Sequence, residues 1–157
     1  MTTTSSTGPT TAWLSEEEQR SWRAYLLGSA LLAERLDAEL RTFGLDLAEY
    51  EILVALSESP ERRIRMAELA AQVHQSRSRL THTISRLERA GLVRRTSCPT
   101  DRRGVWAELD VRGLRLLEAA APAHVTSVRR LLLDAMTAED FEALGRAFAG
   151  VTAACQQ

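Results

Sequence analysis

The sequence from residue 65 to residue 104 reads RMAELAAQVHQSRSRLTHTISRLERAGLVRRTSCPTDRRG. Apolar residues recur at helical spacing twice in this stretch, and a segment with β-strand propensity follows. The first helix is short, with one apolar face made by Met66, Leu69, Ala70 and Val73. Ser76 stands where the second helix should begin, because its hydroxyl can accept a hydrogen bond from an orphan backbone N–H. The pattern therefore predicts helix, turn, helix, strand, turn and strand, with Ile64 as a minimal third strand.

The second helix is expected over residues 77–90. Leu80, Ile84 and Leu87 form its apolar stripe, and Gly91 can end it in a left-handed backbone conformation. The opposite face combines short hydroxyls, long cations and one imidazole, contributed by Arg77, Ser78, Thr81, His82, Ser85, Arg86 and Arg89. Such a face can approach phosphates closely and reach base edges in a major groove. A solvated, arginine-rich surface is the alternative for an isolated helix, but here a short helix precedes and a cationic hairpin follows.

Charge is segregated along the chain. Residues 74–104 contain eight arginines against Glu88 and Asp101, a formal charge of +6. The whole chain carries −1, so the remainder carries −7. A basic segment on an acidic body is the electrostatic pattern expected of a protein that binds a polyanion. A nearly neutral total therefore does not argue against nucleic acid.

This segment resembles the winged helix-turn-helix of the MarR (multiple antibiotic resistance regulator) family. The matching motifs are MAELA before the turn, SRSRLTHTISRLERAGLVRR through the second helix and PTDRRGV at the wing. The resemblance extends over about residues 18–154. It implies a mainly α fold with a small β-wing, in which a winged helix-turn-helix is joined to N- and C-terminal dimerisation helices.

The flanking segments are assigned on that basis. Residues 1–12 are polar and low in complexity, so we expect residues 1–14 to form a disordered tail. Residues 15–43, which open with an S-x-x-E capping box, and residues 111–157 are expected to form the helical dimerisation region. Residues 44–110 would be the winged helix-turn-helix domain. The long helices carry more apolar surface than one small winged domain can cover, and the resemblance implies that they interdigitate with those of a second chain.

The resemblance implies a homodimer on double-stranded DNA, with two such helices in successive major grooves of a near-palindromic operator. By position in the motif, the residues that face DNA are Ser76, Arg77, Ser78, Thr81, His82 and Arg86. Family members more often carry Arg where His82 stands. In the wing, Asp101 would orient its neighbours and Arg103 would enter the minor groove, with Arg102 as the alternative insertion residue.

Many family members release DNA when a small phenolic or anionic ligand binds between the dimer helices and the winged domain. The resemblance therefore implies a repressor with a possible small-molecule effector. Candidate lining residues are Trp22, Arg23, Tyr25, Tyr50 and His124. Ordinary core packing is the alternative for each aromatic residue.

Catalytic motifs are missing from the sequence. The three histidines have no nucleophile or carboxylate at recognisable spacing, and there is no P-loop or zinc motif. We therefore expect no enzyme activity, no metal and no cofactor. We found no signal peptide and no bilayer-length apolar run, so the expected location is the cytoplasm and no membrane partner is expected.

Two alternatives to a sequence-specific regulator remain. A nucleoid-type protein would bind DNA without strong sequence preference. A thiol-based redox-sensing regulator would act through Cys98, which stands where the family commonly has Asp. Arg95 and Arg102 nearby would favour a reactive thiolate at an exposed hairpin tip.

Overall fold

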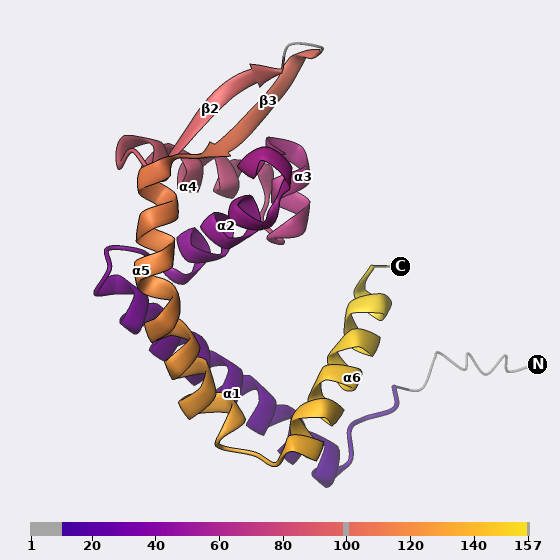
Figure 1. The fold of residues 1–157 in the computed structure, drawn as a ribbon. Coiled ribbons are helices and arrows are strands. Elements are labelled where there is room, and N and C mark those ends of the chain that lie inside the picture. Colours follow the sequence, from indigo (N-terminus) through magenta and orange to yellow (C-terminus); the bar gives the residue numbers. More distant parts are fainter. Residues whose placement is uncertain (1–10, 99–100, 157) are drawn as a thin grey trace, which may run out of the picture.

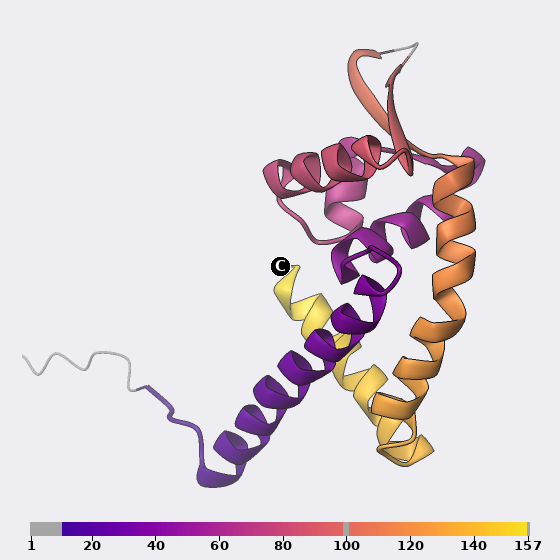
Figure 2. The same ribbon diagram turned by 90° about the vertical axis from the view of Figure 1, so that its left-hand side faces the viewer.

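A computed structural model describes residues 11–98 and 101–156, and for residues 101–103 it describes the backbone alone. The predicted disordered tail falls mostly on residues 1–10, which lie outside the described residues. Figures 1 and 2 show a winged domain at one end of the molecule and long helices that extend away from it. The last helix turns back from their far end toward the winged domain.

The first long helix, α1 (Glu16–Arg41), begins at the predicted capping box. The Ser15 backbone N–H donates to Glu18 at 2.7 Å, and the Glu18 N–H donates back to the Ser15 hydroxyl at 3.2 Å. Two orphan donors are satisfied reciprocally, which explains why the helix starts there. α1 packs against α5 (Val111–Val128), and the buried Ser127 hydroxyl of α5 donates to Glu39 of α1 at 3.0 Å.

The chain after α5 continues through a π-helical turn, η2 (Arg129–Leu133), into α6 (Ala138–Cys155). Thr137 caps α6, because its hydroxyl oxygen accepts from the Asp140 N–H at 3.1 Å. α6, every residue of which is described, buries none of them within the single chain. Its apolar side therefore needs a covering surface from elsewhere.

The winged domain is built from α2 (Leu47–Glu58), a 3-10 turn η1 (Pro60–Arg62), β1 (Arg63–Arg65), α3 (Met66–Gln72), α4 (Arg77–Arg89), β2 (Val93–Cys98) and β3 (Asp101–Leu109). The strands form an antiparallel sheet in the order β1-β3-β2. Ile64 pairs with Ala107 as the predicted third strand. The mainly α fold with a small β-wing is confirmed.

The core of the winged domain lies between α2, α3, α4 and the sheet. The α4 stripe of Leu80, Ile84 and Leu87 is at most 1% exposed, as its spacing predicts. Full burial of such a side chain contributes about 1.5–3 kcal/mol each. Burial of these three residues determines which face of α4 packs against the core. The opposite face is therefore exposed and available to a partner.

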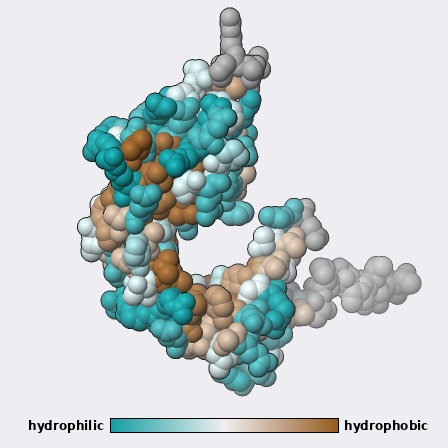
Figure 3. All heavy atoms as spheres, viewed as in Figure 1, coloured by the Kyte–Doolittle hydropathy of each residue, from teal (hydrophilic) through white to brown (hydrophobic). Residues whose placement is uncertain are grey.

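Apolar side chains on α1 and α6 remain uncovered. On α1, Trp22 and Tyr25 stack with ring centroids 5.6 Å apart, and Tyr25 contacts Phe148 of α6 at the same distance. Leu27 is 63% exposed and Val151 is 54% exposed. Apolar residues border the hollow between α6 and the winged domain (Figure 3). Contiguous apolar surface of this kind marks an interaction site.

Candidate nucleic-acid interface

The turn between α3 and α4 sets the angle of α4. His74 lies in this turn with φ 49°, in the left-handed region that non-glycine residues rarely adopt. The Gln75 N–H closes the turn by donating to the Ala70 carbonyl at 2.9 Å. Ser76 then caps α4 by accepting from the Arg79 N–H at 3.2 Å, as predicted. Gly91, at φ 69°, follows the helix in the predicted left-handed conformation.

The outward face of α4 carries most of the residues expected at DNA. Ser76, Arg77, Ser78, Thr81, His82 and Arg86 are all exposed. The Thr81 hydroxyl donates to the Arg77 carbonyl at 2.7 Å, and the Ser85 hydroxyl donates to the Thr81 carbonyl at 2.8 Å. These bonds hold both hydroxyls close to the helix surface. Because these side chains project little from the helix, the backbone of α4 can come close to another surface.

The β2–β3 hairpin projects beyond α4 as a wing (Figure 1). Asp101, Arg102 and Arg103 are the first residues of β3, so they lie at the start of the returning strand. Their side chains are outside the described part of the structure. The expected roles of these three residues in the wing therefore remain predictions.

A groove of about 420 Å³ separates α4 from the wing. Three arginines from different elements line it: Arg65 of β1, Arg77 of α4 and Arg95 of β2. Thr81 and Gly104 complete the walls. The sequence did not indicate that Arg65 or Arg95 would line this groove, because no local pattern shows that β1 and β2 lie beside the N-terminal half of α4. The groove can accept a polyanionic strand that passes between helix and wing.

Several arginines of the basic segment are held by acidic residues. Arg95 pairs with Glu88 at 2.6 Å, and hydrogen bonds from Arg95 lower the pKa of the Glu88 carboxyl. Arg94 pairs with Glu108 at 2.8 Å. The pKa of Glu108 is lowered, first by a hydrogen bond from Thr96 and then by Arg94. The formal charge of +6 therefore overstates the positive charge that is available to a ligand.

Arg86 is placed differently from its neighbours on α4. Its guanidinium pairs with Asp46 at 2.5 Å and with Glu49 at 3.1 Å, both at the start of α2. The sequence pattern put Arg86 among the DNA-facing residues. The structure turns its side chain toward α2 instead, across 40 residues of sequence.

The expected exposure of Cys98 is wrong. Cys98 is 5% exposed at the end of β2, and its sulfur accepts a hydrogen bond from Arg65 at 3.4 Å. A register shift between Ser97 and Cys98 interrupts the strand, and irregularities of this kind re-aim a side chain. A thiol in this position lacks the accessibility that a redox sensor needs.

The five candidate effector residues separate into two groups. Tyr50 and His124 have ring centroids 4.5 Å apart and line a cavity of about 460 Å³ with Leu36 and Val54. Burial raises the pKa of Tyr50 and lowers the pKa of His124, and the His124 Nδ1 atom has no hydrogen-bond partner within the described residues.

The other three candidates lie away from this cavity. Trp22 and Tyr25 stack on each other at the end of α1 that approaches α6. Arg23 donates to Gln19 at 3.3 Å on the same helix. Within one chain, the structure therefore places Tyr50 and His124 at this cavity and places the pair Trp22 and Tyr25 elsewhere.

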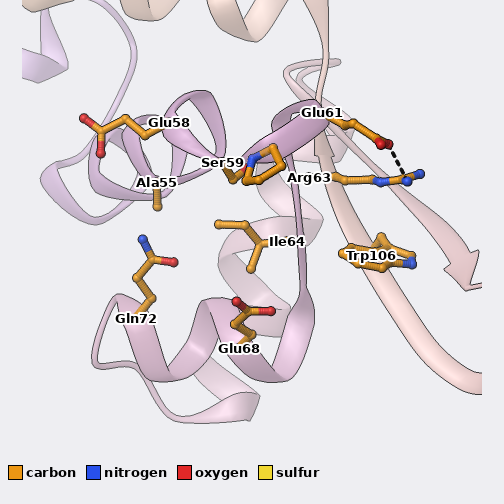
Figure 4. Close-up of a pocket in the computed structure, with 10 residues that line it drawn as sticks. Ala55, Glu58, Ser59, Glu61, Arg63, Ile64, Glu68, Gln72 and Trp106 are labelled. Atoms are coloured by element: carbon orange, nitrogen blue, oxygen red, sulfur yellow. Dashed lines mark ion pairs between the residues drawn. The ribbon is translucent and has the colours of Figure 1, made fainter.

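A further cavity, of about 580 Å³, lies between α2, α3 and β1 (Figure 4). Glu58, Glu61 and Glu68 surround it, and Glu61 forms an ion pair with Arg63. Trp106 closes one side, with the Arg63 guanidinium 5.1 Å from its ring centroid. Three carboxylates repel an anion, so this cavity suits neither DNA nor an anionic effector.

Within residues 11–98 and 101–156, no group of three or more His, Cys, Asp or Glu side chains is placed to hold a metal ion. In the same part of the chain, every helix is too short or too polar to cross a membrane.

The buried stripe of α4, its polar outer face and the adjacent wing define a winged helix-turn-helix DNA-binding protein. A family model described as the MarR family matches residues 43–104. AbsC, a MarR family transcriptional regulator from Streptomyces coelicolor, is 44% identical, with 93% of this chain and 99% of that chain covered and a TM-score of 0.90. The chain belongs to the MarR family of transcriptional regulators.

Two further structures are similar. Sco3205, a MarR family transcriptional regulator from Streptomyces coelicolor solved in complex with DNA, is 43% identical, with 92% of this chain and 95% of that chain covered and a TM-score of 0.90. CouR from Rhodococcus jostii RHA1, solved with p-coumaroyl-CoA bound, is 21% identical, with coverage of 86% and 92% and a TM-score of 0.73, and shows the shared fold alone. A comparison with curated proteins finds no match.

Proposed function

We propose that this protein is a sequence-specific transcriptional repressor that binds a near-palindromic operator as a homodimer. The observation that carries the proposal is the outer face of α4, where exposed hydroxyls and cations adjoin an arginine-lined groove that leads to the wing. The DNA complex of Sco3205, a protein 43% identical to this one, supports the same use of the fold.

Dimerisation follows from the uncovered apolar surface of α1 and α6. Phe148 and Val151 of α6 are 38% and 54% exposed, and Trp22 of α1 is 51% exposed. A second copy of the chain would cover these residues with its own matching helices, as a two-fold interface requires. A dimer would also present two α4 helices, which suits two half-sites about one helical turn apart.

We propose that α4 recognises the base sequence in the major groove and that the wing recognises the shape of the minor groove. Ser76, Arg77, Ser78, Thr81 and His82 would contact the major groove. Asp101, Arg102 and Arg103 would act in the minor groove, where a narrow A·T-rich segment attracts a guanidinium.

The effector proposal centres on Tyr50 and His124. Their cavity lies where α1 and α2 meet α5, so a ligand there would act on the connection between the winged domain and the long helices. An aromatic ligand is supported by the aromatic lining and by the p-coumaroyl-CoA bound to CouR. The described lining holds carboxylates and no arginine, so an anionic group on the ligand would need a cation from the partner chain. Trp22, Arg23 and Tyr25 could line this cavity only from the partner chain, since within one chain they lie elsewhere.

The test is a titration against duplex fragments selected from the genome and against random duplex at one salt concentration. A regulator should prefer the selected fragments by about 10³-fold or more. Equal affinity for both would instead identify a nucleoid-type protein. The burial of the Cys98 thiol does not support a redox-sensing regulator. Cys98→Ser should therefore leave the preference for the selected fragments over random duplex unchanged.

A further inference from the structure

Arg86 occupies one edge of the outer face of α4. Residues advance by about 100° each around an α-helix. Ser78, His82 and Arg89 therefore lie opposite the buried stripe, whereas Arg77 and Thr81 lie on the edge that lines the groove beside the wing. Arg86 lies on the other edge, which faces the junction of α1 and α2. It is thus turned away from the arginine-lined groove.

The partners of Arg86 are the two residues that cap α2. The Asp46 Oδ1 atom accepts from the Glu49 N–H at 2.8 Å, and Glu49 Oε2 accepts from the Asp46 N–H at 3.0 Å. The two oxygens that remain contact Arg86, Asp46 Oδ2 at 2.5 Å and Glu49 Oε1 at 3.1 Å. All four carboxylate oxygens of the capping box therefore have a partner. Two accept backbone N–H groups at the start of α2, and two contact the Arg86 guanidinium.

The same cap is fastened to α1. The Leu47 N–H, at the first position of α2, donates to Asp37 of α1 at 2.9 Å. This bond, followed by a hydrogen bond from Arg41, lowers the pKa of the Asp37 carboxyl. The buried Leu40 and Leu45 hold the intervening turn. Arg86 consequently links α4 to a rigid junction that also orients the first long helix.

A DNA contact by Arg86 would disrupt this arrangement. The side chains of Asp46 and Glu49 are only 27% and 12% exposed, and Arg86 is the cation that contacts both, whereas Arg41 acts on them through its charge without an ion pair. Burial lowers the pKa of Arg86, but the hydrogen bonds and charges of Asp46 and Glu49 outweigh it and raise the pKa overall. If the guanidinium turned to a phosphate, it would leave two carboxylates without their ion-pair partner beside a polyanion.

We propose that Arg86 is a positioning residue, which sets the orientation of α4 on DNA by closing the α2 cap rather than by contacting the duplex. This inference rests on the proposed function, in which α4 contacts DNA. It also implies that Asp46 and Glu49, although negative, favour DNA binding through their effect on the orientation of α4.

Charge-neutral variants separate this role from a DNA contact. Glu49→Gln keeps the capping box, because Gln serves as well as Glu at that position, and removes only the charge toward Arg86. Glu58→Gln is the matched control, since it removes a charge of the same sign from the opposite end of the same helix, away from Arg86. Arg77→Gln is the positive control for a cation on the groove side of α4.

The measurement is affinity for the selected fragments at several salt concentrations, with melting curves for each variant. Arg86→Gln removes both ion pairs and should weaken binding by about five-fold, the value of a strong partly exposed ion pair, with the salt slope unchanged. Glu49→Gln leaves the pair of Arg86 with Asp46, so it should weaken binding in the same direction by a smaller factor. The double variant should be no weaker than Arg86→Gln, because the Glu49 substitution removes part of the same interaction. Arg77→Gln should lower the salt slope by about 0.9 if it contacts a phosphate. Glu58→Gln should not weaken binding.

A direct DNA contact by Arg86 predicts a change in affinity of the opposite sign for Glu49→Gln. If Arg86 contacts DNA, Glu49→Gln should release it and tighten binding, and Arg86→Gln should lower the salt slope. Either result would overturn the inference, as would two weakened variants whose effects add. Failure of the wild type to prefer selected fragments over random duplex would instead overturn the proposed function, and this inference would fall with it.

Discussion

Gly113, in the first turn of α5, lies against the backbone that follows α4. A methyl group at this position would overlap the carbonyl oxygen of Leu92 and would lie 2.8 Å from Leu109 Cδ1. The same carbonyl accepts the Asp110 N–H at 2.9 Å, so it cannot move away without loss of the contact that seats α5. Gly113→Ala should therefore strain the connection between the winged domain and the long helices.

The expected loss of stability follows from two opposing effects. Overpacking against a fixed group costs about 1–3 kcal/mol, and contact with backbone places this case at the upper end. Ala gains up to about 1 kcal/mol over Gly in a helix interior, and less in a first turn. The net destabilisation should be about 2 kcal/mol, or roughly 4–8 °C in melting temperature for a chain of this size.

The assay is thermal melting at one fixed protein concentration, because a dimer melts at a temperature that depends on concentration. Gly150→Ala in α6 is the control, since nothing lies within 4 Å of its added methyl group. That variant should be stabilised by about 0.5–1 kcal/mol. A Gly113→Ala protein that melts at or above the wild-type temperature would refute the close-packing argument.

Four further predictions concern the dimer, the DNA interface and pH. Phe148→Glu should give a helical monomer in sedimentation with no operator binding, and an intact dimer would contradict the proposed role of α6. Thr81→Ala should change the preference among operator variants by about 1–3 kcal/mol if a base contact is lost. Arg103→Ala should instead weaken all duplexes and reduce the salt slope by about one unit; an unchanged slope would remove the wing from the interface. Burial lowers the pKa of His124 below its ordinary 6.5, so the folded state favours the neutral imidazole. The stability that follows from this shift is fully present above pH 6.5 and is lost as the pH falls toward the lowered pKa of the folded state. The melting temperature should therefore drop between pH 7.5 and pH 5.5 in wild type and less in His124→Phe, and equal drops would contradict this assignment.

The local elements of the fold could be predicted because their causes lie within a few residues of each other. Ser15 and Glu18 cap α1 as their spacing of three indicates. Ile84 and Leu87 are buried because helical periodicity places them on one side. Gly91 takes the left-handed conformation that its position after α4 requires. The resemblance to the MarR family, carried by contiguous motifs, pointed to the family that the comparisons then showed.

The tertiary structure decided which side chains meet across long separations. Exposure of the α4 face follows from periodicity, but the attachment of Arg86 to Asp46 depends on how α2 packs beside α4. Burial of Cys98 depends on a register shift and on Arg65 from another strand. Periodicity and capping are encoded locally, whereas these contacts arise only when the core has brought separate segments together. The sequence by itself thus determined the elements and the family, and packing determined which charged groups are left for a ligand.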